Sequence, residues 1–197
     1  RRKVDANGNK LRAWGEAVLK LHPVRRDLHL FMMMTGMRRG AACEARAADL
    51  DLPSKLLHVP KPKGGSSRAF DLPLSGPLAD LFGHRLKENP RVQRGAQWLF
   101  PADSESGHVA EVAQHELDGL TGHALRHTFA TLAVQAGVPL LGLKYLLNHA
   151  ASNVTMGYIH VGPEHLRKHQ ETASRYILEQ LGLEHEPGQW PPRLATM

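Results

Sequence analysis

The stretch TGHALRHTFATLAVQAGVPLLGLKYLLNHAASNVTMGYIH, residues 121–160, contains the residues around which the chain is organised. His123 and Arg126 are three positions apart in a predicted helix, so they lie on one face of it. His149 follows a second predicted helix, and Tyr158 comes nine residues later. An arginine, two histidines and a tyrosine form a set suited to transferring a phosphoryl group onto a tyrosine oxygen.

Each residue type in this set has a chemical reason to be there. A guanidinium is a planar fork that matches two phosphate oxygens, and two of them can neutralise a pentavalent phosphate. A phenol has a pKa of about 10, which nearby cations lower, and a histidine can accept its proton. Tyr145 lies mid-helix among leucines and Tyr176 lies beside Ile177 in the last helix, so we expect both to be structural. Tyr158 remains as the nucleophile.

A second arginine comes from the segment that follows Gly36. Arg38 and Arg39 fall in the first turn of a predicted helix, where backbone amides and a guanidinium form a corner that can bind phosphate. Taken alone, the two arginines fit an ordinary solvated surface of an alanine-rich helix better than a phosphate site.

A lysine comes from a predicted β-hairpin. The Gly64-Gly65 pair predicts a turn between extended runs at 55–59 and 67–72, which places Lys61 and Lys63 near the tip. A flexible ammonium there can reach into a groove and protonate a leaving oxygen, although most charged hairpin tips are simply solvated.

The apolar pattern elsewhere predicts helices at 11–21, 25–35, 77–87, 109–117 and 163–181. Residues 28–34 are apolar nearly all round, so that helix should be buried, and Gly36 should end it. The predicted fold is α+β and mainly α-helical, with a small antiparallel β-hairpin. We expect a linker at 1–10, a catalytic domain at 11–183 and a disordered, proline-rich tail at 184–197.

The composition favours a nucleic-acid partner inside the cell. The net charge is +6 and the pI about 9.7, which suits an anionic partner. The single cysteine, Cys43, excludes an internal disulfide, and no apolar run approaches the length of a membrane span. Neither a cysteine pair nor an HExxH motif accompanies the His123/His127 pair, so we expect no metal and no cofactor. The expected location is the cytoplasm, in association with the nucleoid.

Four motifs occur in an order that is similar to a known family. TGMRRG contains Arg38, KPKGGSSRAFDLPL contains Lys63 with Lys61 as the alternative, HALRHTFAT contains His123 and Arg126, and LLNHAASNVTMGYIH contains His149 and Tyr158. Together they resemble the arginine, β-hairpin, HxxR and final tyrosine boxes of the tyrosine recombinases, the phage integrase family. The resemblance covers residues 11–181.

The resemblance implies a mechanism and an assembly. Tyr158 would attack a phosphate of double-stranded DNA, forming a 3′-phosphotyrosyl link, while Lys63 protonates the 5′-oxygen. Arg38 and Arg126 would bind the phosphate, and His123 and His149 would manage protons. The family implies a homotetramer on recombination sites with exchange of the C-terminal helix, here 163–181, although the isolated fragment can be a monomer.

Two positions depart from the family pattern. Ala41 stands where an acidic residue commonly follows the first arginine, and Asn148 stands where a glycine commonly precedes the final histidine. The N-terminal DNA-clamping domain of the family is absent, and the chain begins at Arg1, so we expect it to be the catalytic half of a longer integrase.

Three other interpretations fit parts of the sequence. A type IB topoisomerase uses the same residues without strand exchange, and a degenerate recombinase would bind DNA without cutting it. A non-catalytic helix-turn-helix protein could use residues 123–148, but a recognition helix needs polar residues at its start. Here residues 139–143 are apolar apart from Gly142.

Overall fold

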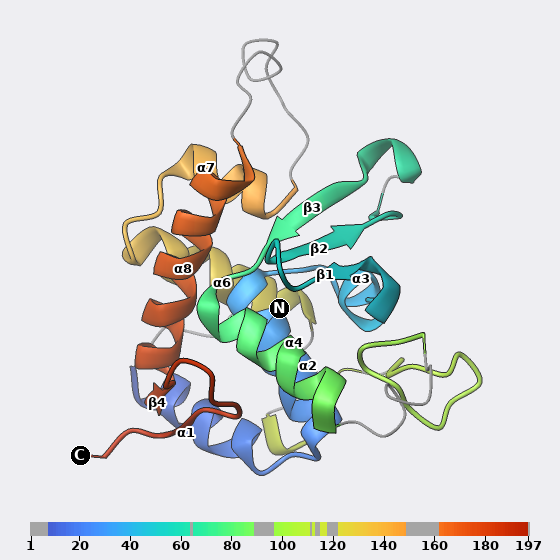
Figure 1. Cartoon of the computed structure of the whole chain (residues 1–197). Helices are drawn as coiled ribbons and strands as arrows, with labels where there is room; N and C mark the ends of the chain where they lie inside the picture. Colours follow the sequence, from blue (N-terminus) through green and yellow to red (C-terminus); the bar gives the residue numbers. More distant parts are fainter. Residues whose placement is uncertain are drawn as a thin grey trace.

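The computed structural model describes residues 8–63, 65–88, 97–110, 112, 115–117, 122–148 and 162–196. Helices surround a central helix, α2, and a small sheet lies at one edge (Figure 1). The helices are α1 (Gly8–Leu19), α2 (Pro23–Thr35), α3 (Arg39–Cys43), α4 (Gly76–Glu88), α6 (Gly122–Gln135), α7 (Leu140–Leu146) and α8 (Pro163–Gln180). Short 3₁₀ turns are η1 (Ala47–Asp49), η2 (Ser66–Arg68) and η3 (His115–Leu117), and the strands are β1 (Leu50–Asp51), β2 (Leu56–Val59), β3 (Phe70–Pro73), β4 (Leu183–Glu184) and β5 (Arg193–Leu194). The predicted mainly helical α+β fold is confirmed.

Helix α2 forms the centre of the core. Its residues 28–34 are all buried, as their continuous apolar character predicts, and α1, α3, α4, α6 and α8 pack around them. Pro23 occupies the first turn, where its missing N–H costs nothing. Gly36 ends the helix in the left-handed conformation, with φ of 62° and its N–H bonded to the Met32 carbonyl. The predicted burial and stop are both confirmed.

The sheet order is β1-β2-β3, antiparallel throughout. Leu57 and Leu72 are paired and buried against the helices, whereas His58 and Asp71 form an exposed ion pair on the other face, 2.7 Å apart. This alternation is what a half-buried hairpin requires. The predicted hairpin is confirmed, with η2 inserted before β3.

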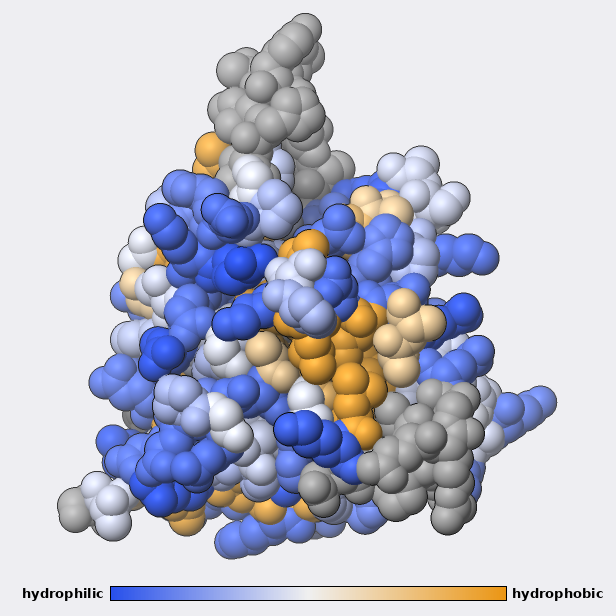
Figure 2. All heavy atoms as spheres, in the orientation of Figure 1, coloured by the Kyte–Doolittle hydropathy of each residue, from blue (hydrophilic) through white to orange (hydrophobic). Residues whose placement is uncertain are grey.

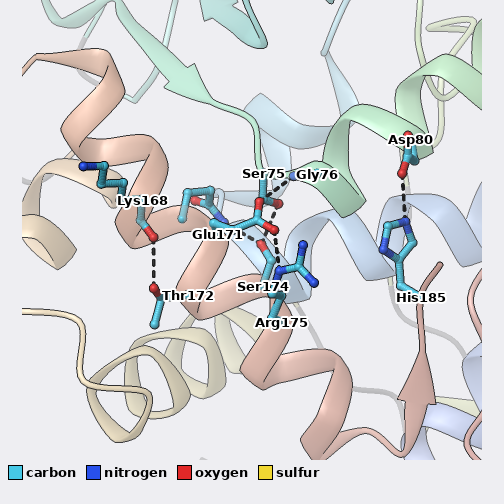
Figure 3. Close-up of polar contacts among 10 residues, drawn as sticks. Ser75, Gly76, Asp80, Lys168, Glu171, Thr172, Ser174, Arg175 and His185 are labelled. Atoms are coloured by element: carbon cyan, nitrogen blue, oxygen red, sulfur yellow. Dashed lines mark hydrogen bonds and ion pairs between the residues drawn. The ribbon is translucent and has the colours of Figure 1, made fainter. Parts of the chain in front are cut away.

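Helix α8 packs on its own chain. The Ser75 hydroxyl donates to the Ser174 hydroxyl oxygen at 2.8 Å, and the Gly76 N–H donates to a Glu171 carboxylate oxygen at 2.6 Å (Figure 3). The Glu171 carboxylate therefore accepts a hydrogen bond from one of the N–H groups at the start of α4, which have no acceptor within that helix. These bonds and its buried apolar side fix α8 against α4, α6 and β3.

The C-terminal tail is ordered, unlike the sequence-based expectation for 184–197. Strands β4 and β5 pair, and the Trp190 indole N–H donates to the buried Asp27 carboxylate at 2.9 Å. His185 lies 3.0 Å from a carboxylate oxygen of Asp80 (Figure 3). Proline-rich composition predicts disorder, but a buried tryptophan and two carboxylate partners outweigh it. The prediction of disorder is therefore wrong for 184–196.

The helix predicted at 109–117 is also wrong for the residues described there. The Val109 N–H donates to the Phe100 carbonyl at 3.0 Å, next to an antiparallel bridge between Pro101 and His108. This pairing holds Val109 extended, and among the described residues of 109–117 the helical structure is the short turn η3. A smaller difference is that Pro139 precedes α7 as its N-cap instead of starting it.

Hydrophilic residues cover most of the face shown in Figure 2, and apolar residues gather beside α4. Within the described ranges, no helix is both long and apolar enough to cross a membrane.

Candidate active site

Arg126, on α6, is held by the ends of two other helices. Its Nη1 donates to the Gly36 carbonyl at 2.6 Å, and its Nη2 donates to the Leu147 carbonyl at 2.7 Å. Gly36 caps α2 and Leu147 caps α7, so both acceptors belong to helix C-termini, which carry partial negative charge. A guanidinium has five N–H donors, so these two bonds fix the fork and leave donors for a ligand.

The charge of Arg126 is only partly balanced. Burial, and then the nearby Arg38 guanidinium, lower the pKa of Arg126 to about 10. It stays protonated at neutral pH, but the direction of the shift shows that its charge is under-compensated. An anion placed between the two arginines would relieve both effects.

Arg38 is the N-cap of α3 and is half-buried, and Arg39 is the first helical residue. Because α3 has only five residues, its dipole is small, and the guanidinium would contribute more than the helix start to binding an anion at this corner. Arg38 makes no hydrogen bond or ion pair with another described residue. Ala41, at the position where the family commonly has an acidic residue, lines a small pocket together with Arg38 and Lys63.

Lys63 lies between the strands of the hairpin, just before η2. It is exposed and lines two neighbouring pockets, the small one that Ala41 lines and the larger cavity described below, and Arg38 and Arg126 line both as well. Lys61 is exposed too but lines neither of them. The geometry thus separates the two lysines that the sequence left as alternatives.

These segments meet at a cavity of about 570 Å³, lined by Arg38, Arg39, Lys63, Gly122, His123, Arg126, His127, Ala130 and Leu147. We call it the basic cavity, because every ionisable side chain in this lining set is an arginine, a lysine or a histidine. Such a cavity, with three arginine forks and an exposed ammonium, is suited to binding a phosphodiester.

Gly122 allows the start of α6 to approach α3. A Cβ there would lie 2.5 Å from the Met32 methyl and 3.1 Å from the Arg39 Cβ. The absence of a side chain therefore brings His123 to the same cavity as Arg39.

His127 is a cavity residue that was not assigned a site role from the sequence. Its Nε2 lies 2.9 Å from the Nε2 of His123. In that contact one nitrogen donates and the other accepts, so at least one ring is neutral and able to take up a proton. The signal was available, because four residues separate the two histidines on one helix.

The predicted residues His149 and Tyr158 lie outside the described residues. The other two tyrosines are half-buried on α7 and α8, and Tyr176 packs against the hydrophobic core. Neither Tyr145 nor Tyr176 lines the basic cavity.

The model of the phage integrase family matches residues 19–165. The chain belongs to that family. This integrase-family chain is 43% identical over 83 residues to the tyrosine recombinase XerD of Brucella abortus, a match that covers 36% of the chain and 27% of XerD. It is 27% identical over 164 residues to the tyrosine recombinase XerA of Pyrococcus furiosus, covering 77% of the chain and 54% of XerA.

The fold of the chain is also found in a solved integrase. The integrase from mycobacterium phage Brujita superposes with a TM-score of 0.64 at 20% identity, covering 92% of the chain and 63% of the integrase. The chain spans less than two thirds of the length of each of these relatives.

Proposed function

We propose that this chain is the catalytic part of a tyrosine site-specific recombinase, which cuts and rejoins duplex DNA for the integration or excision of a mobile element. One observation carries the proposal. Arg38, Lys63 and Arg126 come from three separate segments and line one cavity whose ionisable lining residues are all basic. Membership of the phage integrase family supports the same activity.

The proposed reaction has two balanced steps. The Tyr158 oxygen forms a bond to the scissile phosphorus, and the bond from phosphorus to the 5′-oxygen breaks. His123 or His149 takes the phenolic proton, and Lys63 gives a proton to the leaving 5′-oxygen. The 5′-hydroxyl of a partner strand then attacks the phosphotyrosine and gives its proton to the neutral Lys63 amine. The bond from phosphorus to the Tyr158 oxygen breaks, the histidine returns its proton to that oxygen, and a phosphodiester is restored. The phosphotyrosyl bond conserves the energy of the broken bond, so no ATP is consumed.

The arginines have the electrostatic role in this scheme. Arg126 is already fixed by the carbonyls of Gly36 and Leu147, so it needs little reorganisation when the phosphate becomes pentavalent. Arg38, which is half-buried and lies close enough to lower the pKa of Arg126, would bind the same phosphate from the α3 side.

Double-stranded DNA is the proposed partner. The Tn1549 transposon integrase, which shares the fold with a TM-score of 0.59 at 20% identity, was solved in complex with a circular intermediate DNA. We propose a homotetramer on paired sites. If α8 is exchanged between subunits there, its bonds to Ser75 and Gly76 would form across the subunit boundary instead of within one chain.

The alternative functions account for less. A helix-turn-helix protein would use α7 as its recognition helix, but Leu140 at the start of α7 is apolar and 68% exposed, and the basic cavity would have no chemical role. A type IB topoisomerase would use the same cavity, but the family match favours a recombinase.

The test is covalent trapping. A nicked suicide duplex carrying the element's attachment site is incubated with the protein, and the adduct is separated on a denaturing gel. We expect an adduct with the wild type and with Tyr145→Phe, a tyrosine that does not line the cavity, and none with Tyr158→Phe. An adduct in Tyr158→Phe, or none in the wild type, would contradict the proposal.

A further inference from the structure

Two reciprocal hydrogen bonds join segments that are 80 residues apart in the chain. The Arg68 Nη2 donates to the Asn148 carbonyl at 3.0 Å, and the Asn148 side-chain amide donates to the Arg68 carbonyl at 3.0 Å. Both residues are half-buried. We call this contact the Arg68–Asn148 pair.

One side of the pair belongs to the connection that carries Lys63. Arg68 is the last residue of η2, and its N–H donates to the Gly65 carbonyl at 3.1 Å. The Gly65 N–H in turn donates to the Pro62 carbonyl at 3.0 Å. Lys63 follows Pro62 within this series of bonds, so anything that fixes Arg68 also restricts the backbone of Lys63.

The other side belongs to the end of α7. Asn148 directly follows Leu147, whose carbonyl accepts from Arg126 at 2.7 Å. The φ of Asn148 is 45°, a left-handed value that only one other described non-glycine residue, Lys55, shares. The left-handed turn rotates one peptide plane relative to the next. Two successive carbonyls can therefore accept from guanidiniums on different segments, Arg126 on α6 and Arg68 on the hairpin.

We propose that Arg68 and Asn148 are positioning residues for the proton transfer from Lys63. The pair ties the Lys63 segment to the backbone unit that also holds Arg126, so the ammonium keeps its place relative to the phosphate-binding fork. Arg68 lines neither pocket, and Asn148 lines only the smaller one, so we assign both a positioning role without contact to the reacting atoms. This inference rests on the proposed function, in which Lys63 protonates the leaving 5′-oxygen.

Asn148→Gly is the sharpest variant. Glycine adopts a φ of 45° without strain, so the carbonyl of residue 148 can stay in place while the side-chain donor is lost. Asn148→Asp is a second variant, because aspartate also tolerates this φ, has nearly the same shape and cannot donate to the Arg68 carbonyl. Both variants lose that donor, but Asn148→Asp also adds a negative charge to the small pocket that Asn148 lines with Arg38, Lys63 and Arg126, so Asn148→Gly carries the test.

Single-turnover cleavage is measured on two suicide duplexes, one ordinary and one with sulfur replacing the scissile 5′-oxygen. A thiolate leaves without protonation, so misplacing Lys63 matters only for the ordinary duplex. We expect Asn148→Gly and Asn148→Asp to cut the ordinary duplex about tenfold more slowly than the wild type. Asn148→Gly should cut the sulfur duplex at the wild-type rate, whereas the carboxylate of Asn148→Asp, which shares a pocket with both arginines, should slow the sulfur duplex too.

Two control variants separate the possible failures. Lys63→Ala should be slow on oxygen and restored on sulfur, whereas Arg126→Lys should be slow on both duplexes. Adding Asn148→Gly to Lys63→Ala should slow the ordinary duplex no further, because both changes remove the same function.

Equal slowing of Asn148→Gly on both duplexes, or no slowing on either, would overturn the positioning role while leaving the proposed function intact. If Lys63→Ala is not restored by sulfur, the general-acid assignment fails, and the positioning inference fails with it. No cleavage by the wild type would contradict the proposed function itself.

Discussion

Replacing Gly36 with alanine should destabilise the protein more than the same change at Gly137. Both glycines have left-handed backbones, with φ of 62° at Gly36 and 87° at Gly137. A Cβ at Gly36 would lie 2.4 Å from Phe129 Cδ1 and 2.8 Å from Leu147 Cδ2, whereas a Cβ at Gly137 would have nothing within 4 Å. Gly137 is therefore a matched control that shares the backbone strain and lacks the steric clash.

The two costs can be separated. A left-handed alanine costs about 1–2 kcal/mol, and the loss of unfolded-state entropy on replacing glycine is common to both sites. Overpacking a well-packed site adds about 1–3 kcal/mol. Gly137→Ala should then lower the free energy of unfolding by about 1 kcal/mol, and Gly36→Ala by about 2–4 kcal/mol.

The assay is urea denaturation of the wild type and both variants, with comparable m-values checked first. Equal losses at the two positions would refute the clash. The same variant has a catalytic consequence, because the Gly36 carbonyl accepts from Arg126 at 2.6 Å. Displacing the end of α2 should therefore slow DNA cleavage as well as lower stability.

Three further predictions concern buried and catalytic charges. Asp27→Asn should lower the free energy of unfolding by about 3–5 kcal/mol, because it leaves the buried Arg85 without the carboxylate that lies 2.9 Å away. Asp71→Asn, at the exposed pair with His58, should lower it by less than about 1 kcal/mol. Similar losses for the two variants in urea denaturation would contradict this prediction. Burial lowers the pKa of His29, so the unfolded state binds its proton more readily and stability should fall as the pH drops below about 6.5. Melts at pH 7.5 and 5.5 should show a smaller loss in His29→Gln than in the wild type, and an unchanged loss would rule out His29 as the source. Arg126→Lys should slow cleavage by about 10²-fold or more, because one ammonium cannot replace the two-pronged guanidinium at the phosphate, while DNA binding at low salt should change little. A loss of less than threefold in single-turnover assays would refute the catalytic role of Arg126.

The features predicted from sequence are those encoded by neighbouring residues. Continuous apolar character predicted the burial of residues 28–34, and Gly36 predicted the end of α2. Helical spacing placed His123 and Arg126 on one face, and both line the basic cavity. That Arg38 lies near Arg126 could be expected only from the family resemblance, because no local pattern relates residues 88 positions apart.

The features that sequence reasoning missed depend on partners far along the chain. The proline-rich composition of the tail predicts disorder. The tail is ordered because the Trp190 indole N–H donates to the carboxylate of Asp27, which lies 163 residues away in the chain and is therefore invisible to a local pattern. The segment at 109–117 has a helical pattern, but pairing with Phe100 and Pro101 keeps its start extended. The sequence shows Asn148 where the family commonly has glycine but does not reveal its partner, because its bond to Arg68 exists only in the folded chain.

The central claim is that Tyr158 attacks a phosphate bound at the basic cavity. The most direct measurement is to digest the trapped protein–DNA adduct and locate the DNA remnant by tandem mass spectrometry. The account predicts a single modified peptide, with the 3′-phosphate of the cleaved strand on Tyr158. A remnant on Tyr145, on Tyr176 or on a residue other than tyrosine would contradict it.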